Sequence, residues 1–197
     1  MSDTETHFSR HWYDVVAGDS LRQGDILRGA AGAWIASLPE TEDSAPVVER
    51  ARGDWIVATA SCDLEQRTVS NVLLCQLLPA SIKTLREKTD KDLAIRLEVL
   101  RRGLEITKFL LAESTDLTPE FPRSVVIFRT QVLLPATYIR SLCVGPRLRL
   151  KHPHRERFGA WIGGCFSRIG VEDDASIPKP DKTPFVAPVH VLRSDDD

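Results

Sequence analysis

The sequence predicts an α+β fold, a small β-rich barrel that carries a helical insertion and a C-terminal amphipathic helix. Three observations predict it. Short apolar, β-branched runs are bounded by turn residues, as in strands. Leucines recur at helical spacing between two groups of such runs, and a second helical pattern lies near the C-terminus. With 197 residues and 42% hydrophobic content, the chain is long and apolar enough to bury its own core.

The expected organisation is one barrel domain over residues 1–172, with the helical insertion at about 81–113. Residues 173–197 are rich in proline and charge, and they end in three aspartates. Such a composition buries little apolar surface, so we expect an extended or disordered tail.

The first strands follow a polar lead-in over residues 1–20. A turn over residues 23–25 enters a strand that runs to Arg28, and a short apolar stretch follows at 33–35. The acidic segment 39–46 is typical of an exposed loop. Residues 55–60 and 71–78 are nearly continuous apolar runs, which is the pattern of central strands covered on both faces.

The insertion shows the leucine spacing of helices. We interpret it as one or two helices, with Ser81 and Thr89 as N-caps and Asp92 three residues after Thr89, close to a capping box. Its acidic and basic side chains interleave, which is more typical of a solvated face than of a nucleic-acid groove. The leucines that define the pattern are Leu93, Leu97, Leu100, Leu104 and Leu111.

Two further strands are expected after the insertion. Residues 124–128 form one, which continues, bent, through 131–134 before Pro135. Residues 147–151 alternate strictly between basic and apolar side chains. This alternation predicts a half-exposed strand whose outer face carries Arg147, Arg149 and Lys151.

The clearest helix shows its apolar pattern over residues 158–169, with Gly170 as its C-cap. Its apolar residues are Phe158, Trp161, Ile162, Cys165, Phe166 and Ile169. Gly163 and Gly164 lie inside it, and each glycine costs about 1 kcal/mol relative to alanine. We therefore expect a backbone or a binding partner to approach closely at these two glycines.

Composition and spacing argue against several function classes. The formal net charge of −2 provides no global basic field for nucleic acid or an anionic membrane. The N-terminal residues do not form a signal peptide, and no apolar run reaches the roughly 18 residues that span a bilayer, so a cytoplasmic location without membrane contact is expected. The four cysteines are widely spaced and form no CxxC pair, so neither a metal nor a cofactor is expected.

The first candidate site is Ser61-Cys62-Asp63, at the end of the strand over residues 55–60. Polar residues at a strand end are held rigidly and still reach solvent. Cys62 could act as a nucleophile only if a base or a positive charge lay beside it. The structural alternative is that Asp63 caps the strand end and Cys62 packs inward.

The second candidate site lies between the last strand and the clear helix. His152 and His154 have the His-x-His spacing of metal ligands, but further ligands would have to come from elsewhere in the fold. Arg155 and Glu156 fall in the first helical turn, where Glu156 favours the helix dipole. Arg155 could bind a phosphate or pair with Asp63, and an ion pair is the structural alternative.

Three segments within residues 21–80 resemble the opening of the MazF/PemK toxin barrel. They are Gly24-Asp25-Ile26-Leu27, the strand Trp-Ile-Val-Ala-Thr-Ala-Ser, and Val-Leu-Leu-Cys-Gln-Leu-Leu-Pro. The resemblance implies a small SH3-like barrel, a homodimer and RNA cleavage. The arrangement of Gly-Asp-Ile and Ser-Cys-Asp-Leu-Glu also resembles uncharacterised bacterial proteins, and that resemblance implies no activity.

The sequence departs from the MazF/PemK pattern at the residues that carry cleavage. The family introduces its second strand with Arg-Pro, whereas this chain has Gly53-Asp54 there. An aspartate does not supply the positive charge that stabilises a phosphodiester transition state. The family's Thr-containing loop is replaced by Pro79-Ala80-Ser81 and the insertion, so no ribonuclease residue carries over.

The preferred interpretation is a non-catalytic MazF-like interaction or regulatory module of a bacterial toxin–antitoxin or phage-defence system. It would act through a protein partner or a homodimer. One alternative is an endoribonuclease that uses Asp63, His152, His154 and Arg155 in a rearranged site. Another alternative is a nucleic-acid-binding module that uses the 147–151 strand face. As a binding site, the sequence indicates Ser61, Cys62, Asp63, Arg155, Glu156, Gly163 and Gly164.

Overall fold

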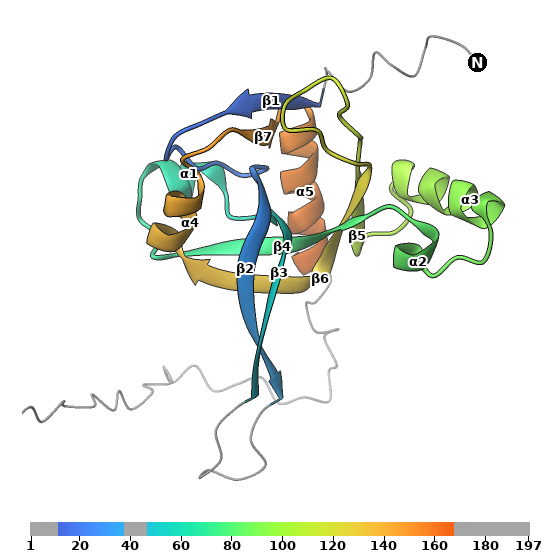
Figure 1. Ribbon diagram of the computed structural model, residues 1–197, viewed down its shortest axis with the longest axis horizontal. Helices are drawn as coiled ribbons and strands as arrows, with labels where there is room; N and C mark the ends of the chain where they lie inside the picture. The colour runs from blue at the N-terminus through green and yellow to red at the C-terminus, as the bar shows by residue number, and fades with distance from the viewer. Residues whose placement is uncertain (1–11, 38–46, 168–197) are drawn as a thin grey trace, which may run out of the picture.

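The computed structural model describes residues 12–37 and 47–167, which form a mixed α/β fold (Figure 1). The strands are β1 (Tyr13–Val16), β2 (Ile26–Ser37), β3 (Val47–Val57), β4 (Asn71–Pro79), β5 (Lys108–Leu111), β6 (Ser124–Pro135) and β7 (Arg147–Leu150). The helices are α1 (Ser61–Glu65), α2 (Ile82–Leu85), α3 (Asp90–Arg101), α4 (Ala136–Leu142) and α5 (His154–Ser167). None of these helices is long and apolar enough to cross a membrane.

The strands form two antiparallel sheets. The larger has the order β2-β3-β4-β6-β5, and the smaller pairs β1 with β7. In the larger sheet β2 and β5 are both edge strands and do not pair with each other. The expected α+β class is therefore confirmed at the level of a mixed fold, but the described strands do not close into a barrel.

Helices cover both faces of the larger sheet. On one face Phe158 and Ile162 of α5 pack with Ile56, Cys75 and Phe109. On the other face lie Leu64 of α1 and Ile139 of α4, which pack with Trp55, Val57 and Leu74. A third and smaller cluster, Leu85, Leu100 and Val125, joins α2 and α3 to the β5–β6 end of the sheet.

The central strands predicted from apolar runs are confirmed, with shifted ends. β3 begins at Val47 and ends at Val57, so Ser61–Glu65 is a short helix rather than a strand end. β2 is one strand from Ile26 to Ser37, with a register shift between Leu27 and Ala30. β6 runs through the predicted bend, which coincides with a register shift opposite Cys75 and Gln76.

The insertion is helical over only part of its predicted length. Ser81 Oγ accepts from the Thr84 amide and Thr89 Oγ1 from the Asp92 amide, so both predicted N-caps are confirmed. The helical prediction for residues 102–113 is wrong, because Lys108–Leu111 forms β5. Leu104 is 71% exposed, and Leu111 is fully buried beneath α5 as part of the sheet.

The predicted basic outer face is wrong for Arg147 and Arg149, whereas Lys151 is half-exposed and pairs with Asp14 at 3.3 Å. The side chains of Arg147 and Arg149 are only 5% and 12% exposed. Both side chains point toward Asp25. The alternation along β7 therefore separates two buried faces, a polar one with the arginines and an apolar one with the leucines. β7 also pairs with β1, a strand that the polar lead-in did not predict.

The C-terminal helix is confirmed as α5, but no backbone of the described chain approaches its paired glycines closely, and the approach of a binding partner there stays a prediction. A Cβ on Gly163 would meet nothing within 4 Å, and one on Gly164 would have only an ordinary contact with Ile106. Tight contacts occur instead at Gly159, against Gln23, and at Gly103, against the ring of Trp161, as well as at Gly24 and Gly32 outside this region. The loop 39–46, Gly170 and the tail 173–197 lie outside the described residues.

Candidate functional site

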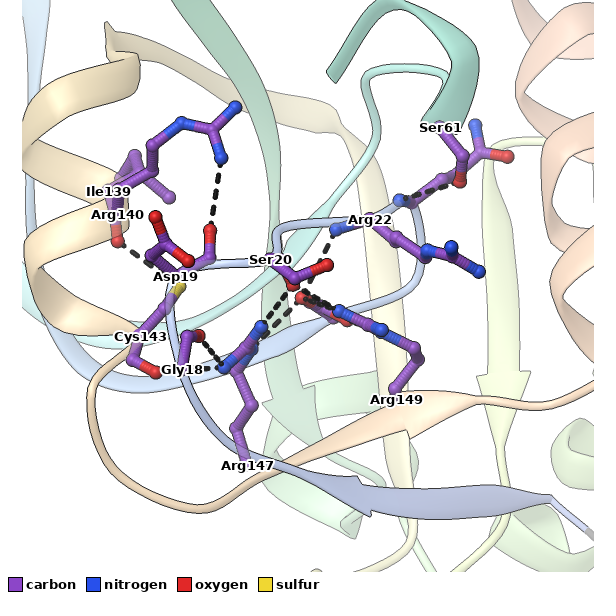
Figure 2. Close-up of polar contacts among 12 residues, drawn as sticks. Gly18, Asp19, Ser20, Arg22, Ser61, Ile139, Arg140, Cys143, Arg147 and Arg149 are labelled. Carbon is purple, nitrogen blue, oxygen red and sulfur yellow. Dashed lines mark hydrogen bonds and ion pairs between the residues drawn. The ribbon is translucent and has the colours of Figure 1, made fainter. Parts of the chain in front are cut away.

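Ser61 of the first predicted site lies beside the loop that precedes β2 (Figure 2). The Gln23 amide donates to Ser61 Oγ at 3.2 Å, and Gln23 Nε2 donates to the Ala58 carbonyl at 2.8 Å. Arg22 pairs with Glu65 at 2.9 Å. Ser61 therefore anchors the loop to the start of α1, and its hydroxyl is engaged in a structural contact.

Asp25 lies at the centre of this region and is completely buried. Its Oδ2 accepts from Arg147 Nε and from the second guanidinium nitrogen of Arg149, both at 2.9 Å, and its Oδ1 accepts from Arg149 Nε. The Arg22 amide adds a bond to Oδ2 at 3.2 Å. One buried carboxylate thus joins two arginines from β7 to the start of β2.

Backbone carbonyls take up the other donors of Arg147. One terminal nitrogen donates to Gly18 at 2.8 Å and to Cys143 at 2.9 Å, and the other donates to Ser20 at 2.6 Å (Figure 2). Arg149 also donates to Ser20. Buried charges are tolerated when they are paired and hydrogen-bonded. Every guanidinium nitrogen of Arg147 makes such a bond, and Asp25 pairs with both arginines.

The predicted residues Cys62 and Asp63 lie on the surface of α1. Cys62 is exposed, and its Sγ is 3.5 Å from Asp63 Oδ1. The Asp63 carbonyl accepts from Thr68 Oγ1. Asp63 has no hydrogen bond or ion pair with His152 or Arg155 within the described chain, so these predicted catalytic candidates are not brought together.

The second predicted group forms its own cluster at the start of α5. Glu156 pairs with Arg155 at 2.8 Å and with His152 Nδ1 at 3.2 Å. The bond from Arg155 is the main cause of the lowered pKa of the Glu156 carboxyl. His154 instead stacks on Trp12, with ring centroids 3.9 Å apart. Over residues 12–37 and 47–167, no three His, Cys, Asp or Glu side chains are placed to hold a metal ion.

A cleft of about 900 Å³, which we call the α3–α5 cleft, lies between α3, β5 and α5. Apolar side chains line its interior, among them Leu97, Phe109 and Trp161. Charged side chains of α3, α5 and the segments that flank β5 border it: Glu98, Arg101, Glu113, Arg123 and Arg157. A concave, mainly apolar space with a few polar groups is the usual form of a binding site.

Specific contacts hold the α5 wall of this cleft in place. Trp161 Nε1 donates to the Ile106 carbonyl at 3.0 Å, and its ring meets Phe109 edge-on at 5.8 Å. Gly103, with φ of +76°, lets the chain pass against the Trp161 ring. The cleft therefore has fixed aromatic side chains, which lose little conformational entropy on binding.

Sequence reasoning missed both Asp25 and the α3–α5 cleft. Asp25 had a signal in the sequence. It is an acidic residue at the start of an apolar strand, and another strand carries two arginines in alternate positions. Such side chains can pair across a core. The cleft had none, because it depends on how α3 is placed against β5 and α5. A comparison of the chain with protein-family models and with curated proteins finds no match.

Proposed function

We propose that the chain is a non-catalytic interaction module that binds a protein partner through the α3–α5 cleft. The observation that carries this proposal is the cleft itself, which is open, aromatic and bordered by charges. The polar motif around Asp25 and Ser61 contrasts with it, because its groups are engaged in contacts within the chain.

The proposed setting is a bacterial toxin–antitoxin or phage-defence system, in which the chain acts as a MazF-like regulatory component. Support comes from the Gly-Asp-Ile segment at the start of β2 and from the apolar strand β4 that ends at Pro79. The relationship to the SH3-like MazF/PemK barrel is part of the proposal. Because the larger sheet is open, the barrel shape itself does not support this relationship. The support comes from the order of the strand-forming segments along the chain.

The two alternatives have less support. An endoribonuclease would need a base and a cation near Asp63, and neither His152 nor Arg155 contacts it. A nucleic-acid-binding face on β7 would need Arg147 and Arg149 in solvent, whereas Asp25 engages both of them. Both alternatives are addressed by incubating the protein with long single-stranded RNA and following cleavage and salt-dependent binding.

Partner capture with a matched pair of variants tests the proposal. Ala94 is an exposed residue of α3 that lines the cleft, and Ala160 is an exposed residue of α5 that does not. Ala94→Trp fills the cleft, whereas Ala160→Trp adds the same ring elsewhere. We expect the wild type and Ala160→Trp to recover a stoichiometric protein from host cells and Ala94→Trp to lose it. Recovery that is equal for all three proteins, or RNA cleavage by the wild type, would contradict the proposal.

A further inference from the structure

The floor of the α3–α5 cleft is the free edge of the larger sheet. Within residues 12–37 and 47–167, β5 pairs with β6 on one side only, and three of its residues, Phe109, Leu110 and Leu111, line the cleft. α3 packs on one face of this strand and α5 on the other. Figure 1 shows β5 between the two helices. An unpaired strand edge is a template for another extended chain.

The pattern of hydrogen bonds between β5 and β6 shows which backbone groups of β5 face the cleft. The Phe128 amide donates to the Thr107 carbonyl, so these two residues form a hydrogen-bonded pair of the antiparallel ladder. Such pairs alternate along the strands, and the register therefore gives Phe109 and Leu111 the bonds to β6. The N–H and C=O of Leu110 then point away from β6, and neither has a partner among the described residues.

Side chains of an added strand would find apolar surface on both sides. Phe109 and Leu111 belong to the cluster beneath α5, where Trp161 and Trp12 also pack. Leu110 turns to the opposite face and packs with Leu97 of α3. Since alternate residues of a strand point to opposite faces, an apolar peptide could place one set against α5 and the other against α3.

The charges at the cleft favour an acidic group on the ligand. Both guanidinium contacts of Arg101 go to Glu98, at 2.6 and 2.7 Å. Arg157 makes only a 3.4 Å bond to the Arg101 carbonyl, and Arg123 only a 3.4 Å contact with Glu113. Arg157 and Arg123 are both exposed and keep most of their donors for a carboxylate.

From these observations we infer that the cleft binds an extended, mainly apolar peptide segment of a partner protein, carrying an acidic residue, as an additional strand along β5. This inference rests on the proposed function and names the form of the partner. Because β5 lies at the floor of the cleft between α3 and α5, an added segment has to enter between the two helices to reach it. Strand addition takes affinity from backbone bonds and specificity from alternate side chains.

The probe is a displayed library of random linear peptides, selected on the full chain. Enriched peptides are expected to combine alternating apolar residues with Asp or Glu, and Ala94→Trp is expected to enrich none of them. A selected peptide is then synthesised with single N-methyl groups along its backbone. Because only alternate amides of a strand face β5, N-methylation should weaken binding by about tenfold or more at every second position and little between.

Two readouts on the protein complete the test. Bound peptide should slow hydrogen exchange of the Leu110 amide by more than about tenfold. The Phe109 amide, which already bonds within the ladder, is the internal control and should change little. Arg157→Gln should lower the affinity for an acidic peptide by about tenfold. It should leave unchanged the affinity for the analogue in which Asn or Gln replaces the acidic residue.

The outcomes separate this inference from the proposed function. If partner capture depends on Ala94 but no peptide is enriched, or if N-methylation shows no alternation, strand addition is wrong and the interaction module stands. A dimer in light scattering that Ala94→Trp dissociates would assign the cleft to a second copy and overturn the inference. If Ala94→Trp changes neither capture nor peptide binding, both proposals fall together.

Discussion

Asp25 and Arg147 are 122 residues apart in the sequence and form a buried ion pair, with Arg147 Nε 2.9 Å from Asp25 Oδ2. The pair ties the start of β2 in the larger sheet to β7 in the smaller one. Arg149 binds the same carboxylate, so a single side chain balances two nearly buried guanidinium groups. The packing of the two sheets therefore depends on this carboxylate.

Replacing Asp25 with alanine should destabilise the protein strongly. The change leaves Arg147 and Arg149 without their carboxylate while both remain largely out of water. Loss of one partner from a buried ion pair costs about 3 to 5 kcal/mol, so we expect the free energy of unfolding in urea to fall by about 3 kcal/mol.

The control for this prediction is Asp63→Ala, which removes an exposed carboxylate near the same loop. Surface substitutions of this kind usually change stability by less than about 0.5 kcal/mol. Equal unfolding midpoints for Asp25→Ala and Asp63→Ala would mean that the buried cluster contributes nothing to holding the two sheets together.

The strands that the sequence predicted best are those buried on both faces. Val57, Val72 and Leu74 are wholly buried, and their runs are nearly continuously apolar. β1 and β5 have four residues each, too few to show a pattern. Their positions come from pairing with other strands, β1 with β7, which is distant in the sequence, and β5 with β6, the next strand along the chain.

The candidate site was harder to predict because its contacts also depend on residues from different segments of the chain. Ser61 was found at the end of a buried run, but its partner Gln23 lies 38 residues away. The sequence indicates Asp63 as one possible partner of Arg155, and the structure instead pairs Arg155 with its immediate neighbour Glu156. Alternation at Arg147 and Arg149 was visible in the sequence, but only the fold shows that the polar side faces Asp25.

Gly103→Ala should destabilise the protein and disturb the α3–α5 cleft. The backbone at Gly103 has φ of +76°, and an added Cβ would lie 2.2 Å from the Trp161 ring. Either the ring or the chain after α3 must move. Positive-φ strain together with overpacking costs roughly 2 kcal/mol, measured as the loss in free energy of urea unfolding.

Gly145→Ala is the matched control, because a Cβ there meets nothing within 4 Å and the φ of Gly145 is not positive. It should leave stability nearly unchanged. Trp161 fluorescence provides a second readout, since its environment should change in Gly103→Ala and not in Gly145→Ala. A Gly103→Ala protein with wild-type stability would show that Trp161 does not occupy this contact in solution.

The native thiols should differ widely in reactivity with an aromatic disulfide reagent at neutral pH. Cys62 is exposed and should react first, and Cys62→Ser should remove that fast phase. Cys75 is buried, which raises the pKa of its thiol to about 12, and the nearby Cys165 is a second, smaller cause of this rise. Burial also raises the pKa of the Cys143 thiol, against the opposing effect of Arg147.

Since the thiolate is the reactive form, Cys75 and Cys143 should stay protected even at pH 9 and react only when the chain opens. All four cysteines should react in denaturant, which is the control for reagent and protein. Urea below the unfolding midpoint should speed the slow phase without altering the phase assigned to Cys62. If Cys75 labels as fast as Cys62 in the folded protein, the packing of β4 beneath α5 is looser than the structure shows.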